Sequence, residues 1–343
     1  MINNKRRASQ PENPAGEHVA VVSGTGSYLP QKVLTNHDLA GLVDTSDEWI
    51  VTRTGISERH IAAADEATSD MAAAAAERAL ENSGVMAEDV DLIIVATVTP
   101  DMLFPNTACF VQNRIGACNA FCFDLEAACC GFLYALKTAR QFLLCGTIDT
   151  ALVIGAEKLS CVTDWDDRAT CVLFGDGAGA AVLQRDKREG HGIMSSVMGS
   201  DGSLADLLKI PGGGSRHPAS PDTIRDRLHY MKMTGREVFK HAVRCMSQSG
   251  RGALKKCGLT VDDVDWVISH QANIRIIHAI GDRLGVPREK LIINLDRVGN
   301  MSGASIPVAL DEAVRDGRIR KGDILLFIAF GGGFTWGATV VGW

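Results

Sequence analysis

The sequence lacks two features that would each direct it to a particular class of protein. No apolar stretch approaches the roughly 18 residues that a membrane-spanning helix requires, so we predict no such helix. There is no basic excess either: 35 Lys and Arg stand against 41 Asp and Glu, for a net charge of −6. This balance argues against a nucleic-acid partner, although it is compatible with a local basic rim that binds an acidic protein.

A targeting signal is also missing from the first residues. Residues 1–16 are polar, and no hydrophobic run follows the basic cluster at residues 5–7. Neither a signal peptide nor a twin-arginine signal has this pattern. We expect residues 1–17 to form a disordered tail and the protein to be cytoplasmic.

The ten cysteines lack the spacing of a metal site or a disulfide framework. No Cys-x-x-Cys pair occurs, and disulfide frameworks are typical of short secreted chains. Several cysteines lie in apolar runs, which favours buried, reduced thiols that pack as small hydrophobic groups. We therefore predict no metal site.

Familiar cofactor and hydrolase motifs are absent as well. The chain contains no Walker loop, no His-Glu-x-x-His and no Gly-x-Ser-x-Gly segment. Gly24-x-Gly26 follows a predicted strand, but Pro30 stands where a dinucleotide fingerprint needs a helix, and the glycine-rich segment 175–179 precedes a strand-like run. We therefore predict no NAD site and no bound cofactor.

What the chain does contain is an internal repeat. Residues 79–91 (ALENSGVMAEDVD) and residues 253–265 (ALKKCGLTVDDVD) share six identical positions at an offset of 174. The same offset relates Ala135-Leu136 to Ala309-Leu310. Matches at one fixed offset over about seventy residues indicate a duplicated unit.

The two units have the same predicted order of elements, a helix, a strand, a second helix and a second strand. After helices that end near Gly84 and Gly258, the expected ranges are 91–97, 131–144 and 150–155 in the first unit and 265–270, 303–315 and 323–330 in the second. Continuous apolar strands alternating with helices indicate sheets covered on both faces. We predict a layered α/β fold with two pseudo-symmetric halves, residues 18–190 and 191–343.

This symmetry predicts where a ligand site lies. Position 129 plus the offset of 174 is 303, so Cys129 and the loop around Asn300 occupy nearly equivalent places in the two halves. His270 ends the strand that is equivalent to residues 91–96, and strand ends are where α/β proteins place ligands. Equivalent loops of the two halves should therefore face one shared cleft.

Cys129 is the leading candidate for a nucleophile. It follows a strand-like run that ends in small residues, and a helical pattern begins at Gly131. A helix N-terminus stabilises a thiolate, which is the reactive form, so we expect a lowered pKa. The alternatives are a packed core cysteine at 129 or the neighbouring Cys130 as nucleophile, although its side chain should point elsewhere.

Three further residues could complete an acyl-transfer site with this thiol. A lone cysteine with remote histidine and asparagine residues is typical of covalent acyl transfer. His270 and Asn300 could both donate to a developing thioester enolate, and the backbone N–H groups of Gly332 and Cys129 could form an oxyanion hole. Each also has a structural interpretation, as a satisfied strand-end histidine, a turn asparagine or a flexible glycine turn.

Six motifs support a more specific interpretation. They are Asp47-Glu-Trp-Ile-Val-Thr-Arg-Thr-Gly-Ile56, Ala128-Cys-x-Gly-Phe132, Phe174-Gly-Asp-Gly-Ala-Gly179, Ser269-His-Gln-Ala-Asn273, Gly299-Asn300 and Phe330-Gly-Gly-Gly-Phe-Thr-Trp-Gly337. Together they resemble the β-ketoacyl-acyl-carrier-protein synthase III family of the thiolase superfamily, from about Val19 to Trp343. The resemblance implies a five-layered αβαβα sandwich of two similar halves, usually a homodimer.

The resemblance also assigns roles residue by residue. It implies that Cys129 is the nucleophile, that His270 and Asn300 stabilise the enolate, and that Gly332 and Cys129 form the oxyanion hole. The other implied positions are Trp49, Arg53 and Arg168 for CoA, Lys240, Gln271 and Arg275 for the carrier protein at the tunnel mouth, and Phe104 and Phe174 for the acyl pocket, with Phe104 coming from the neighbouring subunit. Adenine stacking between an indole and a guanidinium fits this assignment.

The implied reaction is the initiating condensation of fatty-acid synthesis. An acyl-CoA primer would acylate Cys129, malonyl-acyl carrier protein would lose carbon dioxide, and the carbanion would attack the acyl-enzyme to give a 3-oxoacyl product. Acyl-CoA and the malonyl carrier are substrates, not cofactors. Two departures from the family pattern, Cys130 in place of alanine and Arg236 in place of a smaller polar residue, leave reactivity and carrier contacts open.

Three alternative functions are compatible with the same residues. One is a related condensing enzyme of secondary metabolism that uses another acyl donor or acceptor. Another is a non-catalytic acyl-binding protein, which the joint presence of Cys129, His270 and Asn300 disfavours. The last is a cysteine hydrolase, which would also use Cys, His and Asn, but the duplicated architecture disfavours it.

Overall fold

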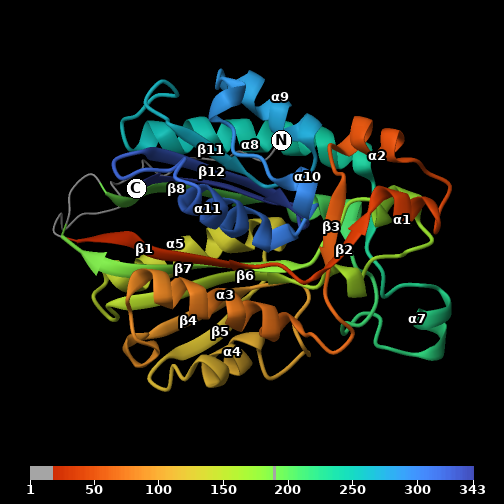
Figure 1. The fold of residues 1–343 in the computed structure, drawn as a ribbon, viewed down its shortest axis with the longest axis horizontal. Coiled ribbons are helices and arrows are strands. Elements are labelled where there is room, and N and C mark those ends of the chain that lie inside the picture. The colour runs from red at the N-terminus through yellow and green to blue at the C-terminus, as the bar shows by residue number, and fades with distance from the viewer. Residues whose placement is uncertain (1–17, 188–190) are drawn as a thin grey trace.

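The computed structural model of the protein describes residues 18–187 and 191–343. The predicted disordered tail, residues 1–17, and residues 188–190 at the predicted joint lie outside the described residues, so the tail and the boundary at 190/191 stay predictions. Five layers are visible in Figure 1, in the order helices, sheet, helices, sheet, helices. This arrangement confirms the predicted fold class.

A five-stranded sheet forms the second layer. Its strands, in the order β1-β7-β6-β4-β5, are β1 (Val19–Tyr28), β7 (Gly177–Asp186), β6 (Thr150–Glu157), β4 (Leu92–Ala96) and β5 (Phe121–Leu125). Strands β6, β4 and β5 are parallel, whereas β1 and β7 run antiparallel to their neighbours. Helices α3 (Thr68–Ser83) and α4 (Thr107–Ile115) cover the outer face of this sheet.

The second sheet repeats this topology. Its strands, in the order β8-β13-β12-β11, are β8 (Gly192–Ser200), β13 (Thr335–Gly342), β12 (Ile324–Gly331) and β11 (Trp266–Ser269). A parallel bridge from Val267 to Leu291 occupies the place that β5 holds in the first sheet. Helices α8 (Gly235–Lys256) and α9 (Ile274–Leu284) cover the outer face.

One helix from each half fills the space between the sheets (Figure 1). These are α5 (Gly131–Leu144) and α11 (Ser305–Arg315), close to the predicted ranges. Each follows a 3₁₀ turn, Ala128–Cys130 or Ser302–Ala304. Ala128 and Ser302 are related by the offset of 174 and share an unusual left-handed backbone, with φ of 47° and 45°. The duplication therefore extends to the local geometry of the two turns.

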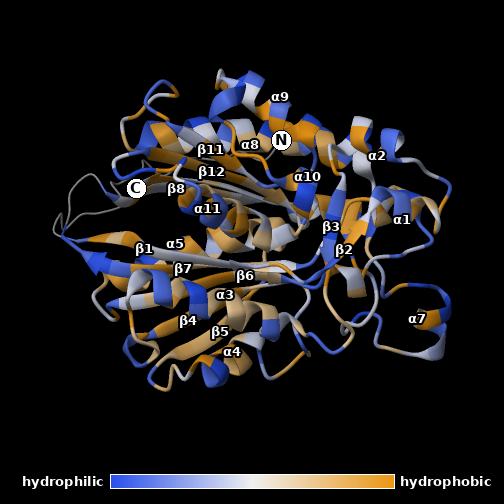
Figure 2. Ribbon diagram, in the orientation of Figure 1, coloured by the Kyte–Doolittle hydropathy of each residue, from blue (hydrophilic) through white to orange (hydrophobic). Residues whose placement is uncertain are grey.

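The apolar pattern of the strands explains the layering. All five residues of β4 are buried: Leu92 and Ile94 face the central helices, and Ile93 and Val95 face α3 and α4. A strand with two apolar faces is stable only when both faces are covered. Figure 2 accordingly shows hydrophobic colour along the strands of both sheets and on the helix faces between them.

The glycine pair of the first strand has a packing role. A Cβ atom on Gly26 would lie 2.4 Å from the carbonyl oxygen of Ala75, and one on Gly24 would lie 2.6 Å from that of Ala79. The two glycines therefore allow α3 to lie directly on β1. Strand β1 also continues through both glycines to Tyr28. A dinucleotide-binding fingerprint would instead need a helix to begin at this point.

Short elements gather at the end of the molecule where the site lies. They are β2 (Lys32–Thr35), α1 (Asn36–Ala40), α2 (Asp47–Thr54), β3 (Glu58–Ile61), α6 (Arg168–Cys171), β9 (Leu208–Lys209), α7 (Pro221–Arg225), β10 (Lys232–Met233) and α10 (Leu295–Val298). The buried guanidinium of Arg59 on β3 donates to Leu34 in β2, Asn36 in α1 and Val172 just after α6, and so links these four elements.

The cysteines correct one prediction. All ten are free thiols, but only Cys130, Cys171 and Cys245 are buried, while Cys118, Cys145 and Cys161 are exposed. The apolar runs around Cys118 and Cys145 end at turns, where a helix or loop returns to the surface. In the described part of the chain, no group of three or more His, Cys, Asp or Glu side chains is placed to hold a metal ion, and no helix there is long and apolar enough to cross a membrane.

Candidate active site

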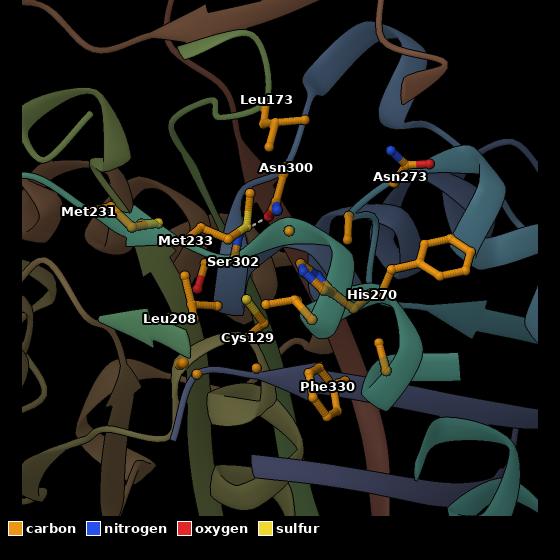
Figure 3. Close-up of a pocket in the computed structure, with 18 of the residues that line it drawn as sticks. Cys129, Leu173, Leu208, Met231, Met233, His270, Asn273, Asn300, Ser302 and Phe330 are labelled. Atoms are coloured by element: carbon orange, nitrogen blue, oxygen red, sulfur yellow. Dashed lines mark hydrogen bonds between the residues drawn. The ribbon is translucent and has the colours of Figure 1, made fainter. Parts of the chain in front are cut away.

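A cavity of about 970 Å³ lies between the two halves, and Cys129, His270 and Asn300 all line it. Most of its wall is apolar, with Leu208, Met231 and Met233 on one side and Phe330 on another (Figure 3). The shared cleft predicted from the symmetry is thereby confirmed, because Cys129 meets His270 and Asn300, which lie more than 140 positions further along the chain. An apolar cavity with a few convergent polar groups is the usual form of a small-molecule site.

The predicted turn from strand to helix positions Cys129. Strand β5 ends at Leu125, the 3₁₀ turn follows, and α5 begins at Gly131. The side chain of Cys129 is partly accessible from the cavity, whereas Cys130 is fully buried in the core between the sheets. Of the two neighbouring thiols, only the first can therefore reach a ligand.

The electrostatic prediction for this thiol is wrong. Burial raises the pKa of Cys129 to about 12, and the nearby Ser302 side chain lowers it only in part. Removal from bulk water penalises the anion more than the nearby dipoles stabilise it. The resting site therefore holds a thiol, and the proton must leave as the sulfur attacks.

His270 follows directly after β11 and points into the cavity. Its backbone N–H donates to the carbonyl of Ile328 (2.8 Å), which fixes the residue at the end of the sheet. The imidazole is 3% exposed, and its Nδ1 atom has no hydrogen-bond partner. Burial lowers the pKa of His270 to about 3, so the ring is neutral at physiological pH and can donate one hydrogen bond without a change of charge.

Two backbone hydrogen bonds fix the position of Asn300. Its N–H donates to Leu173 (2.9 Å), and its carbonyl accepts from Gly175 (3.0 Å). The side-chain oxygen accepts the N–H of Ser302 at 2.9 Å, drawn as a dashed line in Figure 3. With this oxygen occupied, the amide NH₂ group remains as the donor. The structure thus gives two neutral donors, on His270 and Asn300, that line the same cavity as the sulfur.

The glycine-rich loop after β12 brings backbone against the nucleophile. A Cβ atom on Gly331 would lie 2.6 Å from the backbone nitrogen of Cys129, so only glycine allows this approach. Gly332 follows and also lines the cavity. The role of the N–H groups on Gly332 and Cys129 as an oxyanion hole stays a prediction.

The predicted CoA residues form a stack at the cavity entrance. Trp49 and Arg53 line the cavity, and the guanidinium of Arg53 lies 4.7 Å from the centre of the Trp49 ring. Arg168 lies 5.0 Å from the same ring and donates to the carbonyl of Asp44. The structure brings the three together, as predicted.

Of the positions predicted for the carrier protein, one must be corrected. Arg275 lines the cavity, whereas Lys240 is exposed on α8 and does not line it. Gln271, in contrast, is fully buried. Its amide donates to the carbonyls of Ser269 and Ile292 and its oxygen accepts from Asn294, so it joins β11 to the next chain segment and cannot contact a carrier.

The two predicted acyl-pocket residues differ in position. Phe174 is 5% exposed and lines the cavity. Phe104 is 83% exposed on the surface and does not line it. A role for Phe104 in closing the pocket of a neighbouring subunit therefore stays a prediction that requires a second copy of the chain.

Two residues beside the thiol were missed by sequence reasoning. Ser302 lines the cavity together with Cys129, and the fully buried carboxylate of Glu157 accepts the N–H of the next residue, Gly303, at 3.2 Å. The offset of 174 did contain a signal, because it pairs the turn at Ala128 with the turn at Ser302. Glu157 also ends an otherwise apolar strand, where a carboxylate is unexpected.

A cavity-facing thiol, a neutral imidazole and an amide around one apolar cavity, on a five-layered fold of two similar halves, are the features of an acyltransferase of the thiolase type. Sequence comparisons agree with this class. The C-terminal profile of 3-oxoacyl-[acyl-carrier-protein (ACP)] synthase III matches residues 254–343, and a second profile of 3-oxoacyl-ACP synthase III matches residues 123–202.

Individual relatives extend the match to almost the whole chain. β-Ketoacyl-ACP synthase III from Desulfitobacterium hafniense is 56% identical, covering 94% of this chain and 97% of the relative. The crystal structure of 3-oxoacyl-ACP synthase III from Aquifex aeolicus is 48% identical, with a TM-score of 0.87, covering 94% of this chain and 100% of the other. The priming β-ketosynthase of the R1128 polyketide pathway is 36% identical, with a TM-score of 0.87 and 98% of each chain covered. The protein belongs to the β-ketoacyl-ACP synthase III family of condensing enzymes.

Proposed function

We propose that the protein condenses an acyl-CoA primer with malonyl-acyl carrier protein and so starts fatty-acid synthesis. The observation that carries this proposal is the meeting of Cys129, His270 and Asn300 around one apolar cavity whose mouth carries basic side chains. An acidic carrier protein and the phosphates of CoA both suit such a mouth. Its location in the cytoplasm and its assembly as a homodimer are part of the proposal.

Acylation comes first in the proposed mechanism. The Cys129 sulfur attacks the thioester carbon of acyl-CoA, the carbonyl becomes an oxyanion held by the backbone N–H groups of Cys129 and Gly332, and the CoA sulfur leaves with the bonding electrons. The thiol proton leaves the cysteine, and the departing CoA sulfur takes up a proton. The apolar wall around Phe174 would hold the acyl chain.

Condensation follows on the acylated enzyme. Malonyl carrier protein loses carbon dioxide, and the electron pair of the broken C–C bond forms an enolate at the thioester. His270 and Asn300 donate hydrogen bonds to that enolate oxygen, which is where the negative charge develops. The carbanion then attacks the acyl-enzyme, and the Cys129 sulfur leaves and regains a proton.

A panel of acyl-CoA primers with malonyl-acyl carrier protein tests this function. We expect 3-oxoacyl carrier protein as the product, identified by mass, with release of CoA and carbon dioxide. The panel would also show which primer fits the cavity. Release of free acid from acyl-CoA with no need for the malonyl substrate would instead indicate a cysteine hydrolase, and no turnover of any primer would contradict the proposal.

A specialised condensing enzyme of secondary metabolism is the second candidate. The 36% identity to a priming β-ketosynthase of a polyketide pathway supports it, but the 56% identity to a β-ketoacyl-ACP synthase III favours the first. The same panel separates the two, because a primary enzyme should prefer the short primer of its own fatty-acid pathway with its own carrier protein.

Arg168→Ala should weaken acyl-CoA binding about fivefold to thirtyfold, because a cation–π contact contributes roughly 1–2 kcal/mol when partly desolvated. The Michaelis constant for acyl-CoA should rise, whereas acylation by a short thioester without the nucleotide should be unchanged. Arg318→Ala is the matched control, since Arg318 pairs with Asp316 away from the cavity. Equal losses with both thioesters would contradict a role in nucleotide binding.

A further inference from the structure

A buried carboxylate joins the two halves of the molecule beside the cavity. Glu157, the last residue of β6 in the first half, is 0% exposed. One of its oxygens accepts the N–H of Val98 (3.0 Å) and the hydroxyls of Thr97 (3.2 Å) and Thr99 (3.0 Å), all in the segment after β4. The other oxygen accepts the N–H of Gly303 (3.2 Å), in the 3₁₀ turn that precedes α11 in the second half. The proposed mechanism does not use this carboxylate.

Strand β6 is shaped for close contact with that turn. A Cβ atom on Gly155 would lie 2.3 Å from the carbonyl oxygen of Gly303, so the strand and the turn can approach this closely only because residue 155 is glycine. Glu157 lies two residues further along the strand, on the same face of the sheet. The turn is therefore fixed at one residue twice, because the carbonyl of Gly303 lies against the strand and its N–H donates to the carboxylate.

The internal duplication shows what this N–H group corresponds to. The offset of 174 relates Gly303 to Cys129 and Glu157 to Gly331. The end of β12 at Gly331 lies against the turn that carries Cys129, as the end of β6 lies against the turn before α11. In the first half, the N–H of Cys129 is the predicted donor to a substrate oxyanion. In the second half, the equivalent N–H is bonded to the protein's own carboxylate, so its role is to anchor the turn.

The anchored turn in turn orients the side chain of Asn300. The N–H of Ser302 donates to Oδ1 of Asn300 at 2.9 Å, as Figure 3 shows. The equivalent bond in the first half runs from the N–H of Ala128 to the carboxylate of Glu126 at 2.8 Å. A carboxylate can only accept, whereas an amide that accepts through its oxygen keeps its NH₂ group as a donor. The direction of that NH₂ group therefore depends on the position of the turn.

The backbone of this turn needs support from its neighbours. Ser302 has a left-handed backbone, with φ of 45°. A residue other than glycine keeps this conformation only where surrounding contacts hold it. The hydrogen bond from the next residue, Gly303, to Glu157 is such a contact.

We infer that Glu157 is a positioning residue for Asn300. Its carboxylate fixes the turn before α11, and the turn directs the NH₂ group of Asn300 to the enolate oxygen. This inference rests on the proposed function, because it assigns a support to one of the two donors used in condensation. Glu157 does not line the cavity, so it acts on the substrate only through Asn300. Acylation does not need this support, since its oxyanion is assigned to the backbone N–H groups of Cys129 and Gly332.

A carboxylate suits this position because both of its oxygens face backbone N–H groups, of Val98 and of Gly303. An amide has only one acceptor oxygen. In Glu157→Gln, that oxygen should stay with the three donors after β4, and the NH₂ group should then face the N–H of Gly303. The variant thus keeps the size of the side chain and loses its bond to the turn.

Separate measurement of the two half-reactions tests the inference. Glu157→Gln should slow decarboxylation of the malonyl substrate about 10-fold to 10²-fold, because a small displacement of a positioned group costs rate on this scale. Acylation by acyl-CoA should be nearly unchanged. Carbon dioxide release reports the first rate and intact mass the second. Equal slowing of both half-reactions, or no slowing of decarboxylation, would overturn the inference.

A double variant separates positioning from a general loss of packing. Glu157→Gln combined with Asn300→Ala should decarboxylate no more slowly than Asn300→Ala alone, since the support then has no donor to position. Losses that multiply would show that Glu157 acts by another route. If Glu157→Gln does not fold, as judged by circular dichroism, Glu157→Asp decides the question by the same measurements, because it keeps the charge but is too short to hold Gly303 and the segment after β4 together.

Asp311→Asn is the matched control. Asp311 on α11 is 1% exposed, accepts the hydroxyls of Thr25 (2.9 Å) and Ser27 (2.6 Å), and does not line the cavity. Its loss should lower the unfolding temperature and leave the ratio of the two half-reaction rates unchanged. If that ratio fell as in Glu157→Gln, loss of any buried carboxylate would suffice and the inference would be wrong. Failure of the proposed function is distinct, because wild-type protein would then form no acyl adduct with any primer.

Discussion

Cys129→Ala is expected to abolish acyl-enzyme formation, with a loss on the order of 10⁶ in rate, as for the nucleophile of a covalent enzyme. The cavity, the donors and the basic mouth remain in this variant, so acyl-CoA should still bind. The two observations together separate chemistry from binding: titration calorimetry should give an unchanged affinity for acyl-CoA, while intact mass spectrometry should detect no adduct.

Cys130→Ala is the control for this substitution. Cys130 lies in the core between the sheets, fully buried, so its loss should lower the free energy of unfolding by about 1 kcal/mol and leave the acyl adduct in place. Peptide mapping matters here, because Cys118, Cys145 and Cys161 are exposed and could react slowly. A fast adduct that persists in Cys129→Ala would contradict the assignment of the nucleophile.

The repeat explains why so much of the fold could be predicted. The strands and helices of both halves follow from apolar runs, and the offset of 174 places β12 on β6 and α11 on α5. Periodicity says little about the short elements around the entrance, such as β9, β10 and α7, because they are too short to carry a pattern. Their positions come from long-range contacts, such as the pairing of Lys209 on β9 with Lys232 on β10.

The wrong predictions at the site also arise from tertiary contacts that the sequence does not show. Gln271 was expected at the tunnel mouth from the family resemblance alone, but its side chain points inward and bonds to Ser269, Ile292 and Asn294, contacts that only the fold brings together. The pKa of Cys129 was expected to fall because helix position can be inferred from sequence, whereas desolvation by the surrounding cavity cannot. Glu157 and Ser302 are 145 positions apart, and only the fold brings them to one sulfur.

His270→Ala and Asn300→Ala are expected to slow decarboxylation of the malonyl substrate by about 10²–10³, the usual effect of losing one donor to an oxyanion. Acylation should slow far less, because its oxyanion is held by backbone N–H groups instead. The two half-reactions can be measured separately, acylation by mass and decarboxylation by release of carbon dioxide. His278→Ala is a suitable control, since His278 lies on α9 and does not line the cavity.

The pH dependence of decarboxylation distinguishes two forms of the histidine. If a charged imidazolium with an ordinary pKa near 6.5 were the donor, decarboxylation would slow as the pH rises from 5 to 8, because the charged form would disappear. Burial lowers the pKa of His270 to about 3, so the ring is already neutral across that range and the rate should show no such decline. A decline centred near pH 6.5 that vanishes in His270→Ala would show that the malonyl substrate restores the charge, and Asn300 alone would then be the neutral donor.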